Sequence, residues 1–366
     1  MKYRHPLKQI LLQTRSYWDK DETRPSVRQA FLKALLCGTP SLGAEVYASA
    51  NEEKVVCHTC EGRGCASCGF RATIQWQRER WAALPDVPYK GITFTMPDVL
   101  WQLFRENPLL AQALPALAAN VIQAWTSAGY GLRIGIIAIL HTFNGRLEFN
   151  PHVHTMATAG GLQASGTWSS GVYYQQNSLM ECWRDSVIRL LRAALRVGLL
   201  KAEMTTDRVQ AILEEQEKRW WSIKIQSLGS KEHFLRYAGR YVRRPPIAQH
   251  RITYIGERMV RFWTRDKKLR RRIDVQYSPE DFIAHWGTHI PERCRHTIRC
   301  FGLLGPRSLR QTSAAVFVIL GQKQRPCPRH LRWADSIKRD FGSDPLLDHK
   351  GERMKWVRRL APKLST

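Results

Sequence analysis

The stretch that predicts the fold is RIGIIAILHTFNGRLEFNPHVHTMAT, residues 133–158. Its first part, Arg133 to Phe143, is a long apolar run of the kind that forms a β-strand. Asn144-Gly145 follows, and this dipeptide is the strongest short signal for a tight hairpin turn. Arg146 to Thr158 is then the returning strand, so we expect an antiparallel pair.

The segments on both sides of this hairpin complete a β-α-β-β-α-β order with a trailing helix. The expected elements are a strand at 91–96, helices at 97–104, 109–125, 178–197 and 207–218, a strand at 220–226 and a helix at 231–243. Such an order predicts an α+β fold, a ferredoxin-like antiparallel sheet with helices on one face.

The composition points to a polyanionic partner. Among 366 residues, 57 Lys and Arg against 31 Asp and Glu leave a net charge of +26. Each phosphate that a cation neutralises releases condensed counterions, so nucleic acid is the leading partner and an anionic membrane surface the second. The longest apolar run, Ile134 to Leu140, is far shorter than the roughly 20 residues of a spanning helix. With no signal-like stretch at the N-terminus, we expect a cytoplasmic protein that does not enter membranes.

Changes in composition divide the chain into four segments. We expect an N-terminal helical DNA-binding segment at 1–50, a zinc-binding module at 51–88, the large α+β domain at 89–310 and a basic C-terminal segment at 311–366. The last of these is poor in periodicity and predicts an arm or tail.

Four of the nine cysteines are clustered. Cys57 and Cys60 form one Cys-x2-Cys knuckle and Cys65 and Cys68 another, with glycines between them that permit a tight return. In reducing surroundings this spacing predicts a closed, structural S4 zinc site, against the alternatives of coincidence or a redox pair. The scattered cysteines are expected to be small buried residues: Cys37, Cys182, Cys294, Cys300 and Cys327.

The returning strand carries His152 and His154, which are two residues apart and therefore share a face. Two imidazoles on one face can hold a divalent cation, although such a pair is often only a polar sheet face. A two-residue turn would pair His141 with Glu148 and place His141 on that same face. His141 is thus the expected third ligand and Glu148 the alternate.

The expected helix at 231–243 carries Tyr237 and Tyr241, one turn apart on the same face. The alternative to a functional pair is two rings packed in the core. Cations beside a phenol stabilise phenolate and hold phosphate, which favours an activated nucleophile. The expected DNA-binding cations are Arg236, Arg240, Arg243 and Arg244 around the tyrosines, and Lys267, Lys268, Arg270, Arg271 and Arg272 after a short hairpin. Trp220, Trp221 and Trp263 are aromatic rings that could stack on unpaired bases.

Together these motifs resemble one known family. The chain is similar to the bacterial rolling-circle insertion-sequence transposases, the two-tyrosine branch of the HUH endonuclease superfamily. The matching motifs, in family order from about residue 30 to 310, are Cys37-Gly38-Thr39, Cys60-Glu61-Gly62-Arg63-Gly64-Cys65-Ala66-Ser67-Cys68-Gly69, Leu84-Pro85-Asp86-Val87-Pro88, Leu140-His141-Thr142-Phe143, Asn150-Pro151-His152-Val153-His154, Tyr237-Ala238-Gly239-Arg240-Tyr241 and Phe301-Gly302-Leu303-Leu304.

The resemblance implies roles for these residues. His152 and His154 would bind a catalytic Mg²⁺ or Mn²⁺ on the RRM-like palm of an HUH nuclease, and Tyr237 and Tyr241 would be the nucleophiles. Cys60, Cys65 and Cys68 match the zinc module. The family usually has a further Cys-x2-Cys upstream, but Tyr47 to Glu53 contains no cysteine. Cys57 is then the expected fourth ligand, with His58 as the backup.

The implied function is single-strand DNA transposition. The enzyme would bind element-end single-stranded DNA with a hairpin, cleave it through a 5′-phosphotyrosine intermediate and transfer it to target DNA. A replication initiator or relaxase with the same chemistry, and a non-catalytic zinc-ribbon DNA-binding regulator, are the alternatives. One chain holds both tyrosines, so a monomer suffices, and DNA as substrate implies action at the bacterial nucleoid.

Overall fold

The computed structural model describes residues 5–62, 65–242, 245–266 and 269–362. The chain forms two compact units, each assembled from segments that are distant in sequence. The cysteine unit consists of Met1–Trp76, Arg243–Ile290 and Cys327–Thr366, and the histidine unit of Gln77–Val242 and Pro291–Pro326. Each is named after the residue type that clusters in it.

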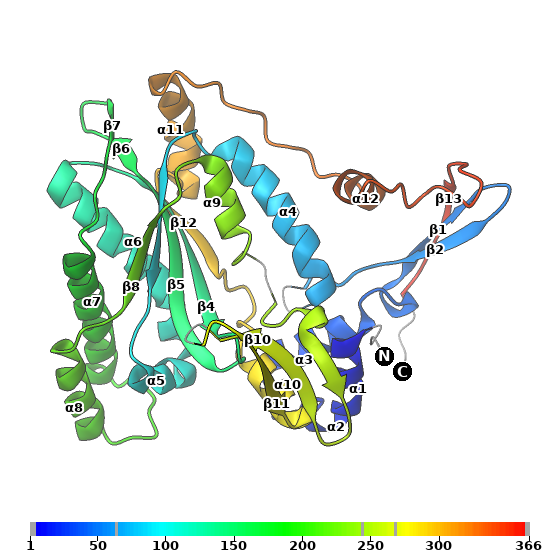
Figure 1. Cartoon of the computed structure of the whole chain (residues 1–366), viewed down its shortest axis with the longest axis horizontal. Coiled ribbons are helices and arrows are strands. Elements are labelled where there is room, and N and C mark those ends of the chain that lie inside the picture. The colour runs from blue at the N-terminus through cyan, green and yellow to red at the C-terminus, as the bar shows by residue number, and fades with distance from the viewer. Residues whose placement is uncertain (1–4, 63–64, 243–244, 267–268, 363–366) are drawn as a thin grey trace. The chain divides into compact units, whose positions relative to one another are not determined.

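The histidine unit is built on a five-stranded antiparallel sheet (Figure 1). The strand order is β12-β4-β5-β3-β8, with bounds Ile298–Gly302, Gly135–Phe143, Phe149–Thr158, Tyr89–Phe94 and Ile223–Ser227. Four of these strands, with the helices between them, follow the predicted β-α-β-β-α-β order. The fifth, β12, was not predicted, and it adds to the free edge of β4.

The central pair, β4 and β5, confirms the predicted antiparallel hairpin, but not its two-residue turn. The connection runs from Asn144 to Glu148. The Asn144 side-chain oxygen accepts hydrogen bonds from the backbone N–H groups of Arg146 (2.8 Å) and Glu148 (3.1 Å), which holds a wider loop. Leu147 is buried at φ +67° within it. The wider loop moves the register, so that His141 lies opposite His152 and not opposite Glu148.

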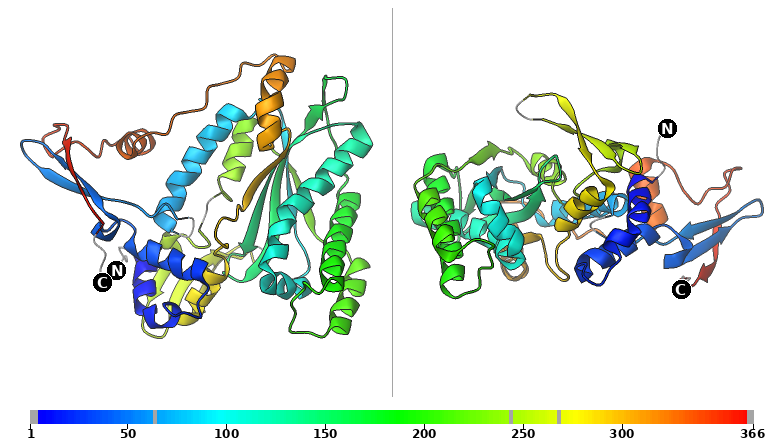
Figure 2. Two further views of the ribbon diagram at one scale, coloured as in Figure 1. Left: turned by 180° about the vertical axis from the view of Figure 1, so that it is seen from behind. Right: turned by 90° about the horizontal axis from the view of Figure 1, so that it is seen from below.

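Four helices, α5 (Trp101–Glu106), α6 (Pro108–Tyr130), α7 (Gln176–Arg196) and α8 (Thr206–Glu217), share one large apolar core with the sheet. Figures 1 and 2 show α6, α7 and α8 to one side of the strands. Leu140 and Val153 point into this core because alternate strand residues face the same side. Trp183 of α7 is fully buried against Phe94, with 4.9 Å between ring centroids.

One helix contradicts the prediction that helices cover one face only. α9 (Lys231–Ala238) packs on the opposite face, where the Phe234 ring lies 4.6 Å from that of Tyr89 in β3. α9 is also shorter than the predicted helix at 231–243, since it ends at Ala238. The unit is completed by α11 (Pro306–Ile319) and by the small pair β6 (Gly160–Leu162) and β7 (Trp168–Ser170).

The cysteine unit contains two three-stranded antiparallel sheets. One, in the order β13-β1-β2, joins Lys355–Leu360 to Ala44–Ala48 and Glu53–Cys57. The other, in the order β11-β10-β9, joins Arg272–Tyr277 to Val260–Arg265 and Ile252–Ile255. The helices are α1 (Pro6–Gln13), α2 (Arg15–Trp18), α3 (Pro25–Leu36), α10 (Pro279–Thr288) and α12 (Trp333–Phe341), and α4 (Ala66–Ala83) starts here and ends in the histidine unit.

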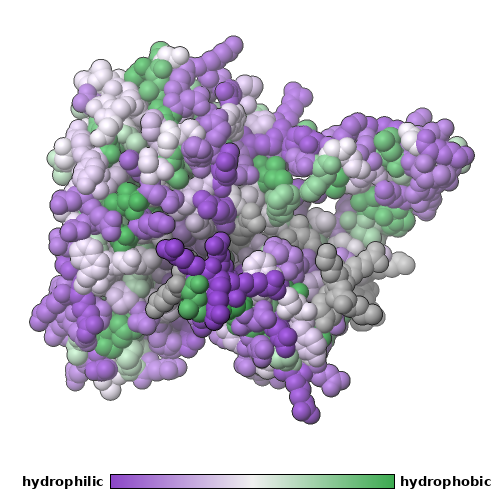
Figure 3. Space-filling view, in the orientation of Figure 1, coloured by the Kyte–Doolittle hydropathy of each residue, from purple (hydrophilic) through white to green (hydrophobic). Residues whose placement is uncertain are grey.

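The basic C-terminal segment contains α12 and the strand β13. On the face of the protein in Figure 3, hydrophilic side chains predominate and apolar ones form small separate patches. Within the described ranges, none of the helices combines the length and apolar character that crossing a bilayer requires.

The core of the histidine unit gives a stability prediction. Trp183→Ala should lower the free energy of unfolding by about 3–5 kcal/mol, because it removes a fully buried indole whose Nε1 donates to the Thr95 carbonyl at 2.8 Å. Denaturant titration followed by circular dichroism measures this. Trp220→Ala is the control, since that ring is 57% exposed and should change stability by less than about 0.5 kcal/mol. Equal losses in both variants would contradict the core assignment.

Candidate functional site

Three histidines converge on the face of the sheet opposite the large core. His141 in β4 lies directly across from His152 in β5, and His154 follows two residues later. Their ring centroids are 4.9–5.5 Å apart, and one ligand nitrogen from each lies within 4.8 Å of the others. His141 and His154 are buried and His152 is half-buried. Three imidazoles at this spacing can bind one divalent cation.

Each imidazole is also oriented by a hydrogen bond through one ring nitrogen. His152 Nδ1 donates to the Asn150 carbonyl (2.8 Å) and His141 Nε2 to the Tyr241 carbonyl (2.9 Å), since a carbonyl only accepts. His154 Nδ1 lies 3.1 Å from the Thr93 hydroxyl. Bonds of this kind fix ring orientation and tautomer in metal-binding histidines.

Glu148, the alternate ligand, is not part of this group. It is exposed in the loop after β4, where its carboxylate accepts from the Asn144 side-chain amide at 2.7 Å. The structure therefore groups His141, and not Glu148, with His152 and His154.

The two tyrosines lie beside the histidines, in different settings. Tyr237 is in α9 and 4% exposed, with its hydroxyl 3.3 Å from His154 Nδ1 and 3.4 Å from the Thr93 hydroxyl. Tyr241 follows the helix in a turn closed by a hydrogen bond from its N–H to the Ala238 carbonyl (2.9 Å). Its ring stacks on that of His154 at 3.7 Å, and the two phenol rings are 4.9 Å apart. Burial raises the pKa of Tyr237 above its usual value.

The start of α9 is anchored by a buried lysine. Lys231 Nζ lies 2.6 Å from a carboxylate oxygen of Asp86 and 3.1 Å from the Leu84 carbonyl, and it sits over the Trp81 ring at 4.6 Å. Ser230 caps the helix by accepting from the His233 N–H. These contacts give a structural reason for the Leu84-to-Pro88 motif, because they hold the helix that carries Tyr237.

The structure describes two of the four arginines that were predicted around the tyrosines. Arg236 and Arg240 are exposed, and the Arg240 guanidinium lies 5.0 Å from the centre of the Tyr237 ring. Arg243 and Arg244 lie outside the described residues. Thr93 was missed by sequence reasoning: its strand was predicted, but the register that places it opposite His154 was not.

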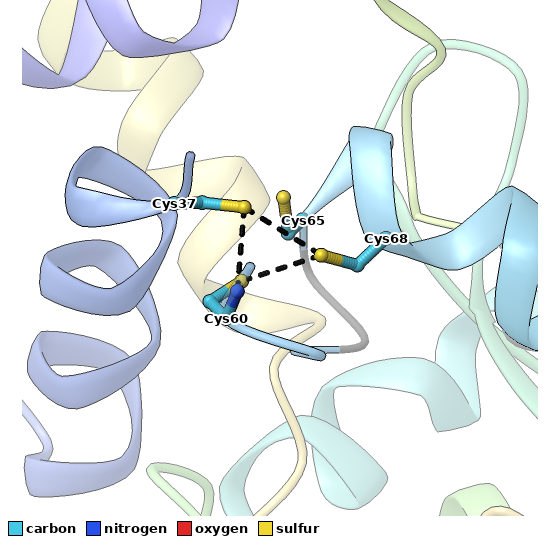
Figure 4. Close-up of side chains that lie close together, drawn as sticks. All are labelled: Cys37, Cys60, Cys65 and Cys68. Carbon is cyan, nitrogen blue, oxygen red and sulfur yellow. Dashed lines mark hydrogen bonds between the residues drawn. The ribbon is translucent and has the colours of Figure 1, made fainter. Parts of the chain in front are cut away.

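In the cysteine unit four thiols converge, as Figure 4 shows: Cys37, Cys60, Cys65 and Cys68. The Sγ atoms of Cys37 and Cys60 lie 3.6 and 3.7 Å from that of Cys68. A tetrahedron with Zn–S bonds of about 2.3 Å has edges of about 3.8 Å, so the spacing fits zinc.

This set differs from the predicted one, because Cys37 stands where Cys57 was expected. Cys57 ends β2, where its backbone pairs with Ala44, and its thiol is not in the cluster. His58, the backup, instead contacts Glu45 (3.0 Å) and the Leu42 carbonyl (3.1 Å). Cys37 follows α3 and comes close because Gly38, at φ +68°, donates its N–H to the His58 carbonyl. The only signal for it was the Cys37-Gly38-Thr39 motif.

The second basic run follows a short hairpin, as predicted: β9 and β10 pair antiparallel just before it. It leads from β10 to β11, with Arg270 and Arg271 exposed between the strands and Arg272 starting β11. Lys267 and Lys268 lie outside the described residues. Trp221 is buried, so it does not offer a ring to bases, whereas Trp220 is exposed and Trp263 is half-buried.

Two protein families match the chain. One is described as "Putative transposase" and matches residues 135–312, a range that contains the three histidines and both tyrosines. The other is described as "Transposase zinc-binding domain" and matches residues 10–96, which contain the four clustered cysteines. The second match and the cluster together support a structural zinc site.

Two relatives extend these matches over most of the chain. The "Transposase for insertion sequence element IS801" of Pseudomonas savastanoi pv. phaseolicola is 33% identical over 326 residues, 86% of this chain and 78% of that protein. The "Putative transposase y4qJ" of Sinorhizobium fredii (strain NBRC 101917 / NGR234) is 28% identical over 303 residues, 78% of this chain and 76% of that protein. No solved structure matches the chain. The likeness to the IS801 protein places this chain in the same family of insertion-sequence transposases, enzymes that cleave DNA and transfer its strands.

Proposed function

We propose that this transposase cleaves and rejoins single-stranded DNA as an HUH nuclease, with Tyr237 and Tyr241 as nucleophiles. The observation that carries the proposal is the contact of both phenols with His154, by a 3.3 Å hydroxyl contact and by ring stacking at 3.7 Å. The strand order β8-β3-β5-β4 supports it too, since this is the order of a ferredoxin-like or RRM-like palm.

The donor set fits a divalent cation. His141, His152 and His154 would hold Mg²⁺ or Mn²⁺, which when bound polarises a non-bridging oxygen of the scissile phosphate. Mg²⁺ prefers six oxygen ligands, so three imidazoles favour Mn²⁺ of the two. Thr93 and the carbonyls of Asn150 and Tyr241 keep the rings in place.

The residues of this chain supply the nucleophile and hold the strand. A tyrosine oxygen forms a bond to phosphorus as the bond from phosphorus to the 3′ oxygen breaks. The phenol proton leaves to solvent, and the 3′ oxygen takes up a proton to become a free hydroxyl. The product is a 5′-phosphotyrosine, which conserves the bond energy for rejoining. Arg240, beside Tyr237, stabilises the charge on the phosphate.

Two tyrosines in one chain suit rolling-circle transposition. One cleavage at the element end and one at the target make two strand breaks, and a monomer suffices for both. The proposed substrates are element-end single-stranded DNA with a hairpin and target DNA, at the nucleoid in the bacterial cytoplasm. The zinc module, with Cys37, Cys60, Cys65 and Cys68 as ligands, is proposed to be structural because four thiolates leave no open position.

The tyrosine mechanism predicts a covalent adduct. Wild-type protein with Mn²⁺ and a single-stranded oligonucleotide of the element end should give an SDS-resistant product, mapped to Tyr237 or Tyr241 by mass spectrometry. The double variant Tyr237→Phe/Tyr241→Phe should lose at least about a thousandfold of this activity, because no nucleophile remains. Tyr173→Phe, whose ring is 69% exposed in the same unit, should act as wild type. An undiminished adduct in the double variant would refute the mechanism.

The histidine site predicts a separation of cleavage from binding. His152→Ala and His141→Ala should each abolish cleavage and weaken Mn²⁺ binding, measured by calorimetry, while oligonucleotide affinity stays within about twofold. His233→Ala, an exposed position on α9, is the control and should leave all three unchanged. Normal cleavage in His141→Ala would exclude it as a ligand.

The zinc site predicts opposite results for two cysteines. Cys37→Ser should lower the zinc content from one ion per chain and destabilise the cysteine unit, because one of four thiolates is lost. Cys57→Ser should retain the ion. Elemental analysis and thermal melting measure these effects. Loss of zinc from Cys57→Ser and its retention in Cys37→Ser would reverse the assignment of the fourth ligand.

A further inference from the structure

The sheet β9-β10-β11 of the cysteine unit has one face built of arginines and aromatic rings. We propose that this outer face binds single-stranded DNA, with unpaired bases stacking on Tyr254 and on the Arg272–Trp263 pair and phosphates contacting Arg261, Arg265 and Arg272. The inference rests on the proposed function in taking a single strand as substrate, and it adds a contact surface outside the histidine site.

The two faces of this sheet differ because strand residues alternate. In β10, Val260, Phe262 and Thr264 are buried, and Phe262 packs on Phe282 of α10 with 5.9 Å between ring centroids. Arg261, Trp263 and Arg265 alternate with them and so belong to the other, outer face. The register adds three residues to that face: Tyr254 opposite Arg261, Asp274 opposite Trp263 and Arg272 opposite Arg265.

Guanidinium groups lie over the aromatic rings of this face. Arg272 is 4.8 Å from the centre of the Trp263 ring, and Arg261 is 5.8 Å from that of Tyr254. Arg251 holds the backbone of Trp263, since its Nε donates to the Trp263 carbonyl at 2.8 Å. Tyr254 is 43% exposed and Arg272 is exposed. A solvent-facing guanidinium plane or phenol ring is a platform on which a base can stack.

The charge of the face is strongly positive. Within the described part of the chain, Arg261, Arg265 and Arg272 make no ion pair with a carboxylate, and Asp274 is the single acid among the strand residues of this face. Arg270 and Arg271 extend the positive charge into the adjoining turn. Three arginines without acidic partners fit a phosphate backbone.

The aromatic rings favour a single strand over a duplex. In a duplex the flat faces of the bases are covered by their neighbours, and only base edges are accessible in the grooves. Unpaired bases expose the faces that stack on Tyr, Trp and Arg. Aromatic rings beside arginines that lack a carboxylate partner in the described part of the chain therefore match single-stranded DNA, since its bases can stack and its phosphates are negative.

The test is binding of a fluorescent single-stranded 30-nucleotide oligonucleotide, measured by anisotropy without added Mg²⁺ or Mn²⁺ so that no cleavage interferes. The triple variant Arg261→Gln/Arg265→Gln/Arg272→Gln should bind at least about tenfold more weakly. Its slope of log affinity against log salt should fall by about 2, since each phosphate contact on a single strand contributes about 0.7. The control Arg189→Gln/Arg196→Gln/Arg208→Gln removes three exposed arginines from α7 and α8 and should keep both values.

Three further variants separate stacking from charge. Tyr254→Leu should weaken binding about tenfold with an unchanged salt slope, whereas Tyr254→Phe should bind as wild type. Arg272→Lys should keep the slope and lose affinity, because an ammonium group has no plane to stack on. Equal affinities for both triple variants would overturn the proposal, as would a Tyr254→Leu protein that binds normally.

A duplex of the same sequence completes the test. It should bind more weakly and be insensitive to Tyr254→Leu; a preference for duplex would overturn the single-strand assignment. Adduct formation with Mn²⁺ at saturating protein distinguishes this inference from the proposed function. The triple variant should still form the adduct, since Tyr237, Tyr241 and the histidines are intact. A wild type that binds through this face without forming any adduct would refute the cleavage mechanism alone.

Discussion

The pairing of β4 with β5 in one register is the constraint on which the site depends. With His141 opposite His152, the side chains that alternate with them, Leu140 and Val153, enter the apolar core under α6 and α7. A slip of one residue would bury the histidines in that core and expose its apolar side chains. The free energy of core burial therefore selects the register, and the register in turn brings three imidazoles within bonding reach of one cation.

The opposite face carries the three histidines but is not open, and this changes the chemistry of its groups. α9 covers part of it and is fixed at its start by the buried Lys231, which pairs with the exposed carboxylate of Asp86. Burial raises the pKa of Tyr237 above its usual value, which makes loss of the phenol proton harder, and this proton must leave during any attack on phosphate. The Thr93 hydroxyl contacts both Tyr237 and His154. The packing that positions Tyr237 thus also raises its pKa.

Much of the histidine site was readable from sequence, and the errors have physical causes. The face of His141 was predicted from a turn of the wrong length, yet the true register differs by four residues, an even number that keeps the same face. Glu148 lies in the exposed loop between β4 and β5 instead of opposite His141, and the hydrogen bonds of the Asn144 side chain hold this wider loop. Spacing within the two knuckles predicted Cys60, Cys65 and Cys68 correctly and Cys57 wrongly. It could not find Cys37, which is 23 residues before Cys60 and comes close through the tertiary pairing of Gly38 with His58.

The two tyrosines are four residues apart, yet they are not equivalent, and the reason lies in the backbone. In a helix continued to 243 both phenols would leave the same face with similar surroundings. The helix instead ends at Ala238, and the tighter turn that follows lets the Tyr241 ring lie flat on His154 while Tyr237 remains buried. Strand transfer by the proposed mechanism needs two successive phosphodiester exchanges. Two identical nucleophiles would compete for the same phosphate, whereas nucleophiles with different burial and different partners can act in a fixed order.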